Sequence, residues 1–490
     1  MNIDHIKRYP IADLSAIISS GQKISIHPST KELLQTKRKA LESTIQNQDQ
    51  IIYGINTGFG VLCDTKINEE DLNQLQINLI RSHSCGYGAI SKAERIKWVL
   101  LLKIISLCKG ASGVRLELVE FLVSLYNEDL IPVVPERGSL GASGDLAPLA
   151  HLSLACIAEG KIMYEGLVYE AKEILSIKKI QAPGLRAKEG LALINGTQYT
   201  LSVLIENIIL ADIVFKAAVQ SAILSSEAFH VNRDIFHPEI HSLRNQNGQQ
   251  KIAKIIDDQI SKPSRPLYSV QDPYSFRCIA QVMGASLDAF QYVQKIAENE
   301  IQSVSDNPLI LSDGKVVSGG NFHAQPLAMA ADILKLAMAE LGSIAERRIY
   351  LLVCGHRDLP NFLIEDAGLS SGYMIVQYAA ASLVSQNKQL ATPAIVDSIV
   401  TSKGQEDHVS MATNAALQSL ELTNNVMQIV AMEWMTACRA WNFRDQWKLN
   451  PISLKHLTNY LQRIPHKILD HIPSQDYQPT IEFLVSEMKS

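Results

Sequence analysis

The stretch Leu201-Ser-Val-Leu-Ile-Glu-Asn-Ile-Ile-Leu-Ala-Asp-Ile-Val-Phe-Lys-Ala-Ala218 decides the fold. Its leucine, isoleucine, valine and alanine residues recur at spacings of three and four, which is the period of a helix. No proline interrupts the chain between Asn195 and His237. Because apolar side chains cover almost all sides of such a helix, other helices must surround it. We therefore expect a long helix inside a bundle.

Other segments have the same long, alanine- and leucine-rich pattern. They are residues 327–345, 374–391 and 407–438. A set of about four or five such helices is typical of a helix bundle, which we expect to extend across subunits. The sequence thus predicts a mainly α protein built around a long-helix bundle.

Residues 1–195 have a more mixed pattern. We expect helices from about residue 30 and at 69–82, 91–107, 114–126 and 147–158, an extended segment at 23–27, a strand from residue 51 into a glycine-rich loop, and irregular or β structure at 161–190. After residue 450, prolines interrupt shorter helices. The prediction is a smaller mixed N-terminal domain (1–195), a central long-helix bundle (196–450) and a C-terminal short-helix tail (451–490).

The composition excludes several classes of protein. The chain has 490 residues and a formal net charge of −5, with no dense Lys/Arg block, which argues against a nucleic-acid or anionic-membrane surface. Its 7 cysteines are scattered and form no C-x-x-C pair, so neither a disulfide framework nor a thiolate metal site is indicated. Residues 1–10 lack the apolar core of a signal peptide, and charged or Gln residues interrupt the apolar segments. We expect a soluble cytoplasmic protein.

A segment of small residues, Gly141-Ala-Ser-Gly-Asp145, occurs in the N-terminal domain. Glycine permits a tight bend in which the amide nitrogen of Gly144 approaches the carbonyl carbon of Ala142. Attack of that nitrogen closes a five-membered ring, and loss of water, including that from the Ser143 side chain, leaves an exocyclic methylene. The product is an electrophile made from the chain itself. The alternative is a polar turn before a helix near Leu146, with the aspartate as its cap.

Two other motifs suggest different chemistry. Gly368-Leu-Ser-Ser-Gly372 matches the G-x-S-x-G of serine hydrolases, but that motif needs a parallel sheet and here lies between helical segments. His230, His237 and His241 cluster in the sequence, and the last two have ligand-like i, i+4 spacing. Because Pro238 argues against a regular helix through that pair, we expect a surface turn with capping histidines and no metal site.

Three polar residues have both a functional and a structural interpretation. Arg277 lies among aromatic and apolar neighbours and needs an anionic partner, which a substrate carboxylate or an internal acid would provide. His83, taken by itself, is better interpreted as an ordinary half-buried imidazole. Glu406 belongs to an acid- and imidazole-bearing segment at a predicted helix start, where capping explains part of the pattern.

Together, five longer motifs resemble those of the aromatic amino-acid ammonia-lyase family. They are Tyr53-Gly-Ile-Asn-Thr-Gly-Phe-Gly60, Gly141-Ala-Ser-Gly-Asp-Leu-Ala-Pro-Leu-Ala-His151, Leu193-Ile-Asn-Gly-Thr197, Ser318-Gly-Gly-Asn-Phe-His323 and Gln405-Glu-Asp-His-Val-Ser-Met411. The resemblance extends from Tyr53 to about Met435 and is greatest to the histidine-specific members. Five motifs in the right order are far more specific than a single short pattern.

The resemblance implies a cofactor and an assembly. Ala142, Ser143 and Gly144 would cyclise autocatalytically to 4-methylidene-imidazol-5-one, without an external cofactor. The protein would be a homotetramer of long helices, with each active site drawn from three subunits. Its chemistry would be removal of ammonia from an α-amino acid to give a trans-α,β-unsaturated acid.

The same resemblance implies roles for single residues. Tyr53 matches the tyrosine proposed to accept the β-proton of the substrate. A phenol has a pKa near 10, so its pKa must fall by about 3 for this work near pH 7, which corresponds to roughly 4 kcal/mol. The remaining matches contact the substrate or the prosthetic ring: Asn195, Gln271 and Tyr274 at the ring or the amine, Arg277 at the carboxylate, and Phe322 as an aromatic wall.

The expected substrate depends on His83 and Glu406, which can both hydrogen-bond an imidazole. A site built for a polar ring rejects an isostere without those groups by about 10⁴–10⁵. Phenylalanine and tyrosine lyases usually have a shorter Gln-Asp motif at the position of Glu406. We therefore expect elimination of ammonia from L-histidine to give trans-urocanate, the first step of histidine degradation. A tyrosine ammonia-lyase or aminomutase, or a catalytically silent oligomeric member of the family, is the alternative.

Four residues, at three places in the sequence, depart from the histidine-specific pattern. Ile279-Ala280 stand where a Gln-Pro pair is usual, Ala324 replaces a glycine, and Gly404 replaces an asparagine. None of these changes removes a named catalytic group, so they bear on the detail of the substrate pocket and not on the reaction class.

Overall fold

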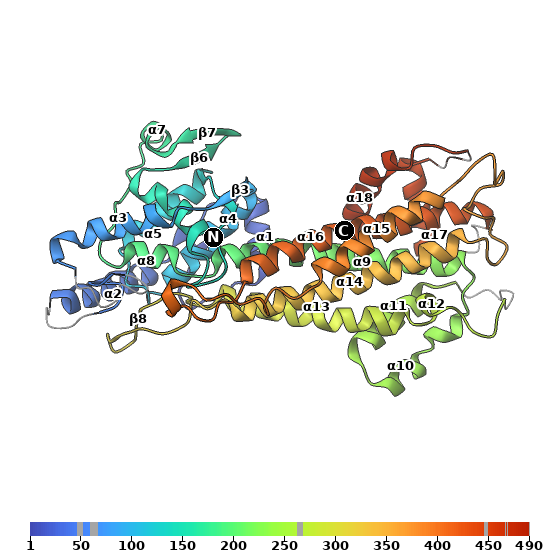
Figure 1. Cartoon of the computed structure of the whole chain (residues 1–490), viewed down its shortest axis with the longest axis horizontal. Helices are drawn as coiled ribbons and strands as arrows, with labels where there is room; N and C mark the ends of the chain where they lie inside the picture. The colour runs from blue at the N-terminus through green and yellow to red at the C-terminus, as the bar shows by residue number, and fades with distance from the viewer. Residues whose placement is uncertain are drawn as a thin grey trace. The chain divides into compact units, whose positions relative to one another are not determined.

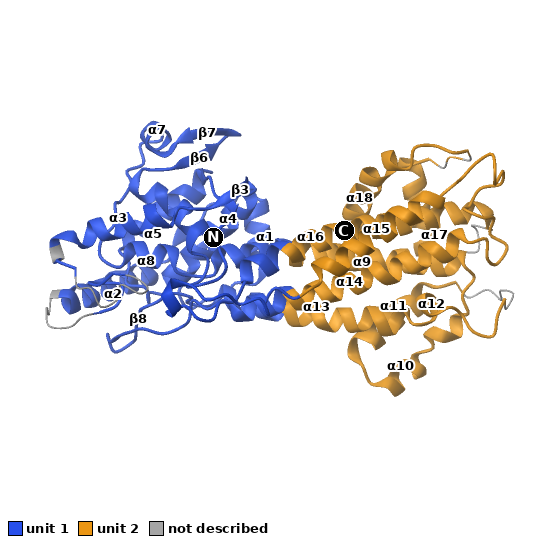
Figure 2. Ribbon diagram, in the orientation of Figure 1, with its two compact units in different colours: residues 1–206, 295–331, 393–417 blue, residues 207–294, 332–392, 418–490 orange. Residues whose placement is uncertain are grey.

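The computed structural model of the chain describes residues 1–46, 52–58, 67–261, 268–444, 449–465, 467 and 469–489. The chain divides into two compact units (Figure 2). Unit 1 consists of Met1–Glu206, Lys295–Ala331 and Pro393–Leu417, and unit 2 consists of Asn207–Gln294, Asp332–Thr392 and Gln418–Ser490. The predicted division at residues 195 and 450 is a division along the sequence, and it stays a prediction.

Unit 1 combines helices with small sheets (Figure 1). Its helices before residue 195 are α1 (Ile11–Ser19), α2 (Pro28–Gln46), α3 (Leu72–His83), α4 (Ala93–Cys108), α5 (Leu116–Asn127), α6 (Leu146–Ser153), α7 (Ala171–Ile177) and α8 (Glu189–Ile194). In its first sheet, β1 (Asn2–Ile3) pairs in parallel with β2 (Ser25–Ile26). The other sheets are antiparallel: β3 (Tyr87–Ile90) pairs with β5 (Pro135–Arg137), and β8 (Leu309–Ile310) pairs with β9 (Val316–Val317). In the three-stranded sheet, β6 (Lys161–Tyr164) lies between β4 (Ile131–Pro132) and β7 (Leu167–Glu170). The predicted mixture of helices and β structure is confirmed.

The strand predicted from residue 51 is wrong for residues 52–58, which form turns. The amide of Ile52 donates to Asn56 Oδ1 at 2.7 Å, and the amide of Gly54 donates to Thr57 Oγ1 at 3.1 Å. These local side-chain acceptors replace the strand partner that an extended segment would need. Residues 51, 59 and 60 of the same motif lie outside the described part.

Helix α4 forms the core of unit 1, because nearly all of its side chains are buried. Its sequence is apolar on every side, so neighbouring elements must cover it in all directions. Helix α5 is one of these neighbours. Lys103, in the middle of α4, is buried with the apolar residues, and its ammonium needs partners within the fold.

Long helices dominate the rest of the chain, so the predicted mainly α fold with a long-helix bundle is confirmed (Figure 1). They are α9 (Gln198–Ala228), α13 (Ile279–Ile301), α14 (Gln325–Val353), α15 (Met374–Leu390) and α16 (Ala412–Ala440). Helix α13 has no counterpart among the predicted segments. Helix α16 begins later than the predicted residue 407, because Met411 has a left-handed backbone with φ of 53°.

A buried ion pair joins three long helices inside unit 2. Arg348 of α14 donates to Glu433 of α16 at 2.6 and 2.8 Å, and neither side chain is exposed. Ser225 of α9 donates to the same carboxylate at 2.8 Å. A bidentate pair of this kind fixes the register of the helices that carry it.

The shorter helices of unit 2 are α10 (Pro238–Arg244), α11 (Asn247–Gln259), α12 (Tyr274–Arg277), α17 (Pro451–Arg463) and α18 (Ser474–Lys489). The two C-terminal helices pack on α16 through an aromatic cluster. The ring of Trp434 lies 5.8 Å from that of Phe483 and 6.1 Å from that of Tyr460. The short-helix tail is thus attached to the bundle by apolar burial.

Helix α9 is long and apolar enough to cross a membrane by length and composition alone. Its most apolar window is 72% buried inside the protein, as in the core helix of a bundle. The burial of α9 explains its hydrophobicity without a lipid environment.

Candidate functional site

The segment of small residues forms a tight turn with Ala142 and Ser143 at its centre. Gly141 and Gly144 are joined by a single antiparallel bridge, and φ is 52° at Ser143 and 80° at Gly144. Ser139 Oγ accepts the amide of Gly141 at 3.2 Å and donates to the carbonyl of Gly144 at 3.2 Å. The backbone therefore folds back on itself as the sequence predicts, with a strained non-glycine residue at the bend.

Gly144 lies against the main chain of Gly196. The amide of Asp145 donates to Gly196 O at 2.8 Å, and a Cβ on residue 144 would lie 2.2 Å from that same oxygen. Because no side chain can occupy this space, only glycine permits the turn to pack here. The contact brings the turn directly beside Asn195.

The Asp145 side chain does not cap the helix that follows it, so this part of the turn interpretation is wrong. Helix α6 begins at Leu146 without a side-chain cap. The carboxylate instead accepts the amides of Tyr199 and Thr200 in the first turn of α9 at 2.7 and 3.0 Å, and the Thr200 hydroxyl at 2.5 Å. Burial raises the pKa of the Asp145 carboxyl to about 6, although these donors favour the charged form.

Glu406 meets the turn from a distant part of the chain. Ser143 Oγ donates to Glu406 Oε1 at 3.3 Å, and Thr401 Oγ1 donates to Glu406 Oε2 at 2.8 Å. Both residues belong to unit 1, and Glu406 is half-buried. The two carboxylate oxygens thus have different partners, one on the turn and one on the loop before α16.

His83 ends α3 close enough to Glu406 for the two to interact electrostatically. Burial lowers the pKa of the His83 imidazole below its ordinary value, and the Glu406 carboxylate opposes part of that change. His83 Nδ1 shares a hydrogen bond with Ser82 Oγ at 3.0 Å. Nearby, the amide of Gly86 donates to Nε2 of His151 at 3.0 Å, which joins the segment after His83 to the helix after the turn.

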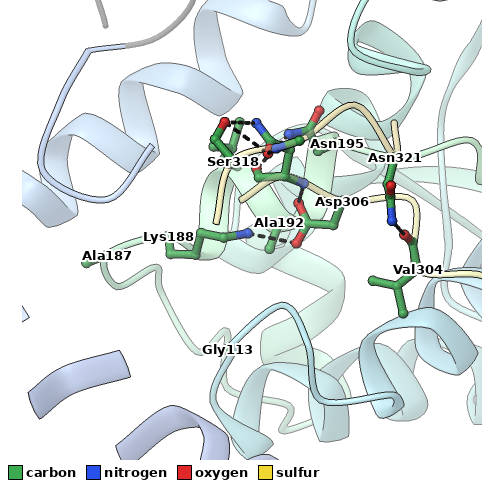
Figure 3. A network of polar contacts seen from close by, with 12 residues as sticks. Gly113, Ala187, Lys188, Ala192, Asn195, Val304, Asp306, Ser318 and Asn321 are labelled. Carbon is green, nitrogen blue, oxygen red and sulfur yellow. Dashed lines mark hydrogen bonds and ion pairs between the residues drawn. The ribbon is translucent and has the colours of Figure 1, made fainter. Parts of the chain in front are cut away.

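Asn195 is fixed by a buried polar network (Figure 3). Its Nδ2 donates to the carbonyl of Asn307 at 2.9 Å, and the amide of Asn307 donates to Asp306 Oδ1 at 2.7 Å. Asp306 Oδ2 in turn pairs with Lys188 Nζ at 2.7 Å. Because Asn307 O accepts Nδ2, Asn195 Oδ1 must face the other way, and this buried oxygen has no hydrogen-bond partner in the described structure.

Lys103 holds the main chain of the same residue. Its Nζ donates to Asn195 O at 2.7 Å and to Ala192 O at 3.0 Å, which satisfies carbonyls at the C-terminal end of α8. Burial lowers the pKa of the Lys103 ammonium to about 8. Asn195 is therefore held through both its backbone and its side chain.

Tyr53 lies in the 52–58 loop and is half-buried. The next residue, Gly54, packs so closely on α8 that a Cβ there would lie 2.3 Å from Leu191 Cδ2. Because α8 ends at Ile194, immediately before Asn195, the loop and the asparagine are positioned by one helix. Tyr53 thus belongs to the same unit as the turn.

Phe322 precedes a contact with the Glu406 segment. It is half-buried, and His323 Nε2 lies 3.2 Å from the carbonyl of His408. The rings of His323 and His408 stack with centroids 5.8 Å apart. Unit 1 therefore contains eight of the predicted positions: Tyr53, His83, Ala142, Ser143, Gly144, Asn195, Phe322 and Glu406.

Gln271, Tyr274 and Arg277 belong to unit 2. Gln271 is exposed, and Tyr274 is 71% exposed at the start of α12. The guanidinium of Arg277 lies over the Tyr274 ring at 4.4 Å. Among the residues that the structure describes, no acidic side chain pairs with Arg277, so the internal-acid alternative finds no support there.

The rival motifs do not form sites in the described structure. The G-x-S-x-G residues form a bend before α15, with a bridge between Ala367 and Ser370, and no strand occurs in the described part of unit 2. No regular helix runs through both His237 and His241, as expected, because α10 begins at Pro238 and His237 lies just before it, where its Nδ1 caps the helix by accepting the amide of Glu239 at 3.3 Å. His241 is buried and bonds to Ile235 O and Gln249, and no metal-type cluster occurs among the described residues.

Sequence reasoning missed three contributors to this geometry: Thr401, Lys103 and Asn307. Their partners are 5, 92 and 112 residues away along the chain. A buried lysine in the middle of the apolar α4 was a usable signal, because such a charge needs dedicated acceptors. Thr401 and Asn307 carry no comparable signal in the sequence.

With this geometry in place, comparison with known proteins identifies the family. Residues 9–464 match the sequence pattern described as aromatic amino acid lyase. The chain belongs to the aromatic amino acid lyase family. The five motifs of the sequence all lie within the matched region, so the predicted membership is confirmed.

Two curated members of the aromatic amino acid lyase family illustrate the similarity. The histidine ammonia-lyase of Idiomarina loihiensis is 43% identical over 435 residues, covering 87% of this chain and 85% of the relative. The histidine ammonia-lyase of Shewanella woodyi is 45% identical over 408 residues, covering 82% and 80%.

Solved structures of the family have the same fold. The histidine ammonia-lyase of Trypanosoma cruzi aligns with a TM-score of 0.89 and 35% identity, covering 100% of this chain and 93% of that one. The phenylalanine aminomutase of Pantoea agglomerans aligns with a TM-score of 0.93 and 26% identity, covering 99% and 98%. One lyase fold therefore accommodates different substrates, and the site residues must distinguish them.

Proposed function

We propose that this protein is an ammonia-lyase that converts L-histidine to trans-urocanate and ammonia, the first step of histidine degradation. The observation that carries the proposal is the contact of Glu406 with Ser143, because it places a carboxylate beside the turn that would become the electrophile. The curated relatives named histidine ammonia-lyase support the same substrate.

The residues of the turn fit a self-made 4-methylidene-imidazol-5-one. The Gly141–Gly144 bend, the absence of room for a Cβ at Gly144 and the buried oxygen of Asn195, which has no partner among the described residues, all suit a compact group formed there. Such a group supplies an electrophile that activates the substrate for loss of ammonia. No external cofactor is needed in this proposal.

The side chains of the protein bind the substrate and move its protons. Glu406 and His83 offer polar atoms to an imidazole ring, and Tyr53 accepts the β-proton. Asn195 Oδ1 is fixed as an acceptor and suits the amino group, because an ammonium can only donate. Arg277 binds the substrate carboxylate, since a half-buried arginine that pairs with no acid among the described residues suits an anionic ligand.

The remaining assignments concern the other unit and the assembly. We assign Gln271 and Tyr274 to the amine and the prosthetic ring, and Phe322 to the wall of the pocket. We further propose a homotetramer whose active sites are drawn from three subunits and which works in the cytoplasm. Sedimentation of the purified protein tests the assembly, and a monomer that is fully active would contradict it.

Two measurements test the function. The intact mass of the purified chain should be lower than the linear mass by two waters, and the full linear mass would refute the enzyme proposal. Incubation with L-histidine should produce trans-urocanate, followed by its ultraviolet absorbance, while L-tyrosine should give no coumarate. Turnover of tyrosine alone would reassign the substrate and favour the tyrosine-specific alternative.

A further inference from the structure

The two oxygens of the Glu406 carboxylate accept hydrogen bonds from different hydroxyl groups, and only one of these hydroxyls would remain after ring formation. Oε1 accepts from Ser143 Oγ at 3.3 Å, and Oε2 accepts from Thr401 Oγ1 at 2.8 Å. The inference drawn here rests on the proposed function, in which ring formation removes the Ser143 hydroxyl as water. After that step Oε1 loses its partner, whereas Oε2 keeps the hydroxyl of Thr401.

The loop that carries Thr401 is built to return onto Glu406. The Thr401 amide donates to Glu406 O at 3.0 Å, and the Gly404 amide donates to Thr401 O at 2.9 Å, which closes a tight hairpin. Its bend has left-handed backbones at Ser402, Lys403 and Gly404, with φ of 47°, 54° and 90°. Two of these residues are not glycine, so the surrounding structure must hold the bend in place.

We propose that Thr401 is a positioning residue that orients the Glu406 carboxylate toward the substrate. The last torsion of a glutamate is broad, so an unanchored carboxylate rotates freely. The hydrogen bond from Thr401 to Oε2 limits this rotation and therefore restricts the directions that Oε1 can take. Once the Ser143 hydroxyl has left, Oε1 is then ready to accept a hydrogen bond from the imidazole of the substrate.

The hydroxyl of Thr401, and not its bulk, carries this role. Thr401→Val keeps the branched shape and removes the donor, whereas Thr401→Ser keeps the donor. A hydrogen bond to a charged group corresponds to about tenfold to hundredfold in an equilibrium constant. We expect Thr401→Val to weaken the binding of trans-urocanate by roughly tenfold or more and to raise the KM for L-histidine similarly, while Thr401→Ser stays within about threefold of the native protein.

Inhibition by trans-urocanate and by trans-cinnamate separates positioning from a general structural effect. Cinnamate has a benzene ring and cannot donate to Glu406, so its inhibition constant should be the same in the native protein and in Thr401→Val. The matched control is Thr423→Val, which removes a buried hydroxyl that donates to Ser419 O at 2.9 Å in unit 2. Thr423→Val should leave both inhibition constants unchanged.

The outcomes are distinguishable. A native protein with the full linear mass, or without histidine turnover, refutes the proposed function itself. A native protein with the mass deficit and turnover, together with a Thr401→Val variant that binds both inhibitors normally or loses both equally, refutes only the role of Thr401. Should Thr401→Val fail to fold, Thr401→Ala repeats the same comparison with the same expected selective loss of urocanate binding.

Discussion

Ser143 Oγ lies 3.3 Å from Glu406 Oε1, although 263 positions separate the two residues along the chain. The contact joins the turn that would form the electrophile to the carboxylate that would select the substrate. One oxygen of Glu406 therefore faces Ser143, and the other accepts a hydrogen bond from Thr401. This arrangement makes it possible to separate the residues needed for ring formation from those needed for turnover.

Glu406→Gln should impair turnover without preventing ring formation. The amide has nearly the same shape but carries no charge, so it can stabilise neither a protonated imidazole nor a proton transfer. We expect kcat/KM for L-histidine to fall by about 10²–10⁴, with the mass deficit of two waters intact. Steady-state kinetics and intact-mass measurement of the same preparation test this. A restored linear mass would instead assign Glu406 to ring formation.

Gly144→Ala should prevent the turn from closing. Its Cβ would lie 2.2 Å from Gly196 O, and φ at residue 144 is 80°. Gly166→Ala is a matched control, because its φ is 79° and nothing lies within 4 Å of the new Cβ. Both variants bear the left-handed cost of about 1–2 kcal/mol, but only Gly144→Ala should show the linear mass and no activity. Normal ring formation in Gly144→Ala would show that the turn can relax.

Arg277→Gln should weaken substrate binding while leaving the fold stable. Because no described acidic side chain pairs with Arg277, its removal leaves no buried acid unpaired. We expect the KM for L-histidine to rise by about 10–100-fold, with a thermal midpoint close to that of the native protein.

The control for Arg277 is Arg357→Gln. Arg357 pairs with the buried Asp272 at 2.8 Å. Removal of the arginine leaves the Asp272 carboxylate buried without this cation and should therefore lower the thermal midpoint. Equal destabilisation in the two variants would indicate that Arg277 is a structural residue.

Because Lys103 is buried, the free energy of unfolding should change with pH in the alkaline range. Burial lowers the pKa of its ammonium from 10.5 to about 8, so between these values the unfolded chain binds more protons than the folded chain. The free energy of unfolding should therefore rise with pH across this window, by up to about 3 kcal/mol from this group. Below pH 8 the Lys103 ammonium is protonated in both the folded and the unfolded state, so it does not change the free energy of unfolding with pH.

Thermal midpoints of the native protein and of Lys103→Met, measured from pH 7 to 10.5, test this dependence. The midpoint of the native protein should rise relative to that of the variant as the pH increases. Lys335→Met is a comparison for the loss of a buried ammonium in unit 2, where Lys335 donates to Thr392 O at 2.8 Å and to Gln418 at 3.0 Å. Because Lys335 also pairs with the buried Asp332 at 2.7 Å, this variant should be less stable at every pH, and only the change of its midpoint with pH is compared. Parallel midpoints of the native protein and Lys103→Met across this range would contradict the lowered pKa.

Much of the fold could be predicted because helix formation depends on residues close together in the sequence. The apolar spacing of residues 201–218 predicted α9, and the small residues at 141–144 predicted the tight turn. The sequence does not predict α10, because proline disfavours the interior of a helix, whereas at the first position of a helix it is favourable. The prediction of a strand at residue 52 is wrong because the amides of Ile52 and Gly54 donate to side chains within the loop.

The sequence alone determined the helical architecture, the bend at Ala142–Gly144 and the family, since each depends on local spacing or on motifs read in order. Only the tertiary structure decided which groups meet: that Asp145 binds the start of α9, that Lys103 holds Asn195, and that Thr401 holds Glu406. The physical reason is that a buried donor must find an acceptor, and many acceptors in the chain are chemically equivalent. Which acceptor a donor meets depends on which groups the folded chain brings close together, and no local pattern in the sequence encodes that.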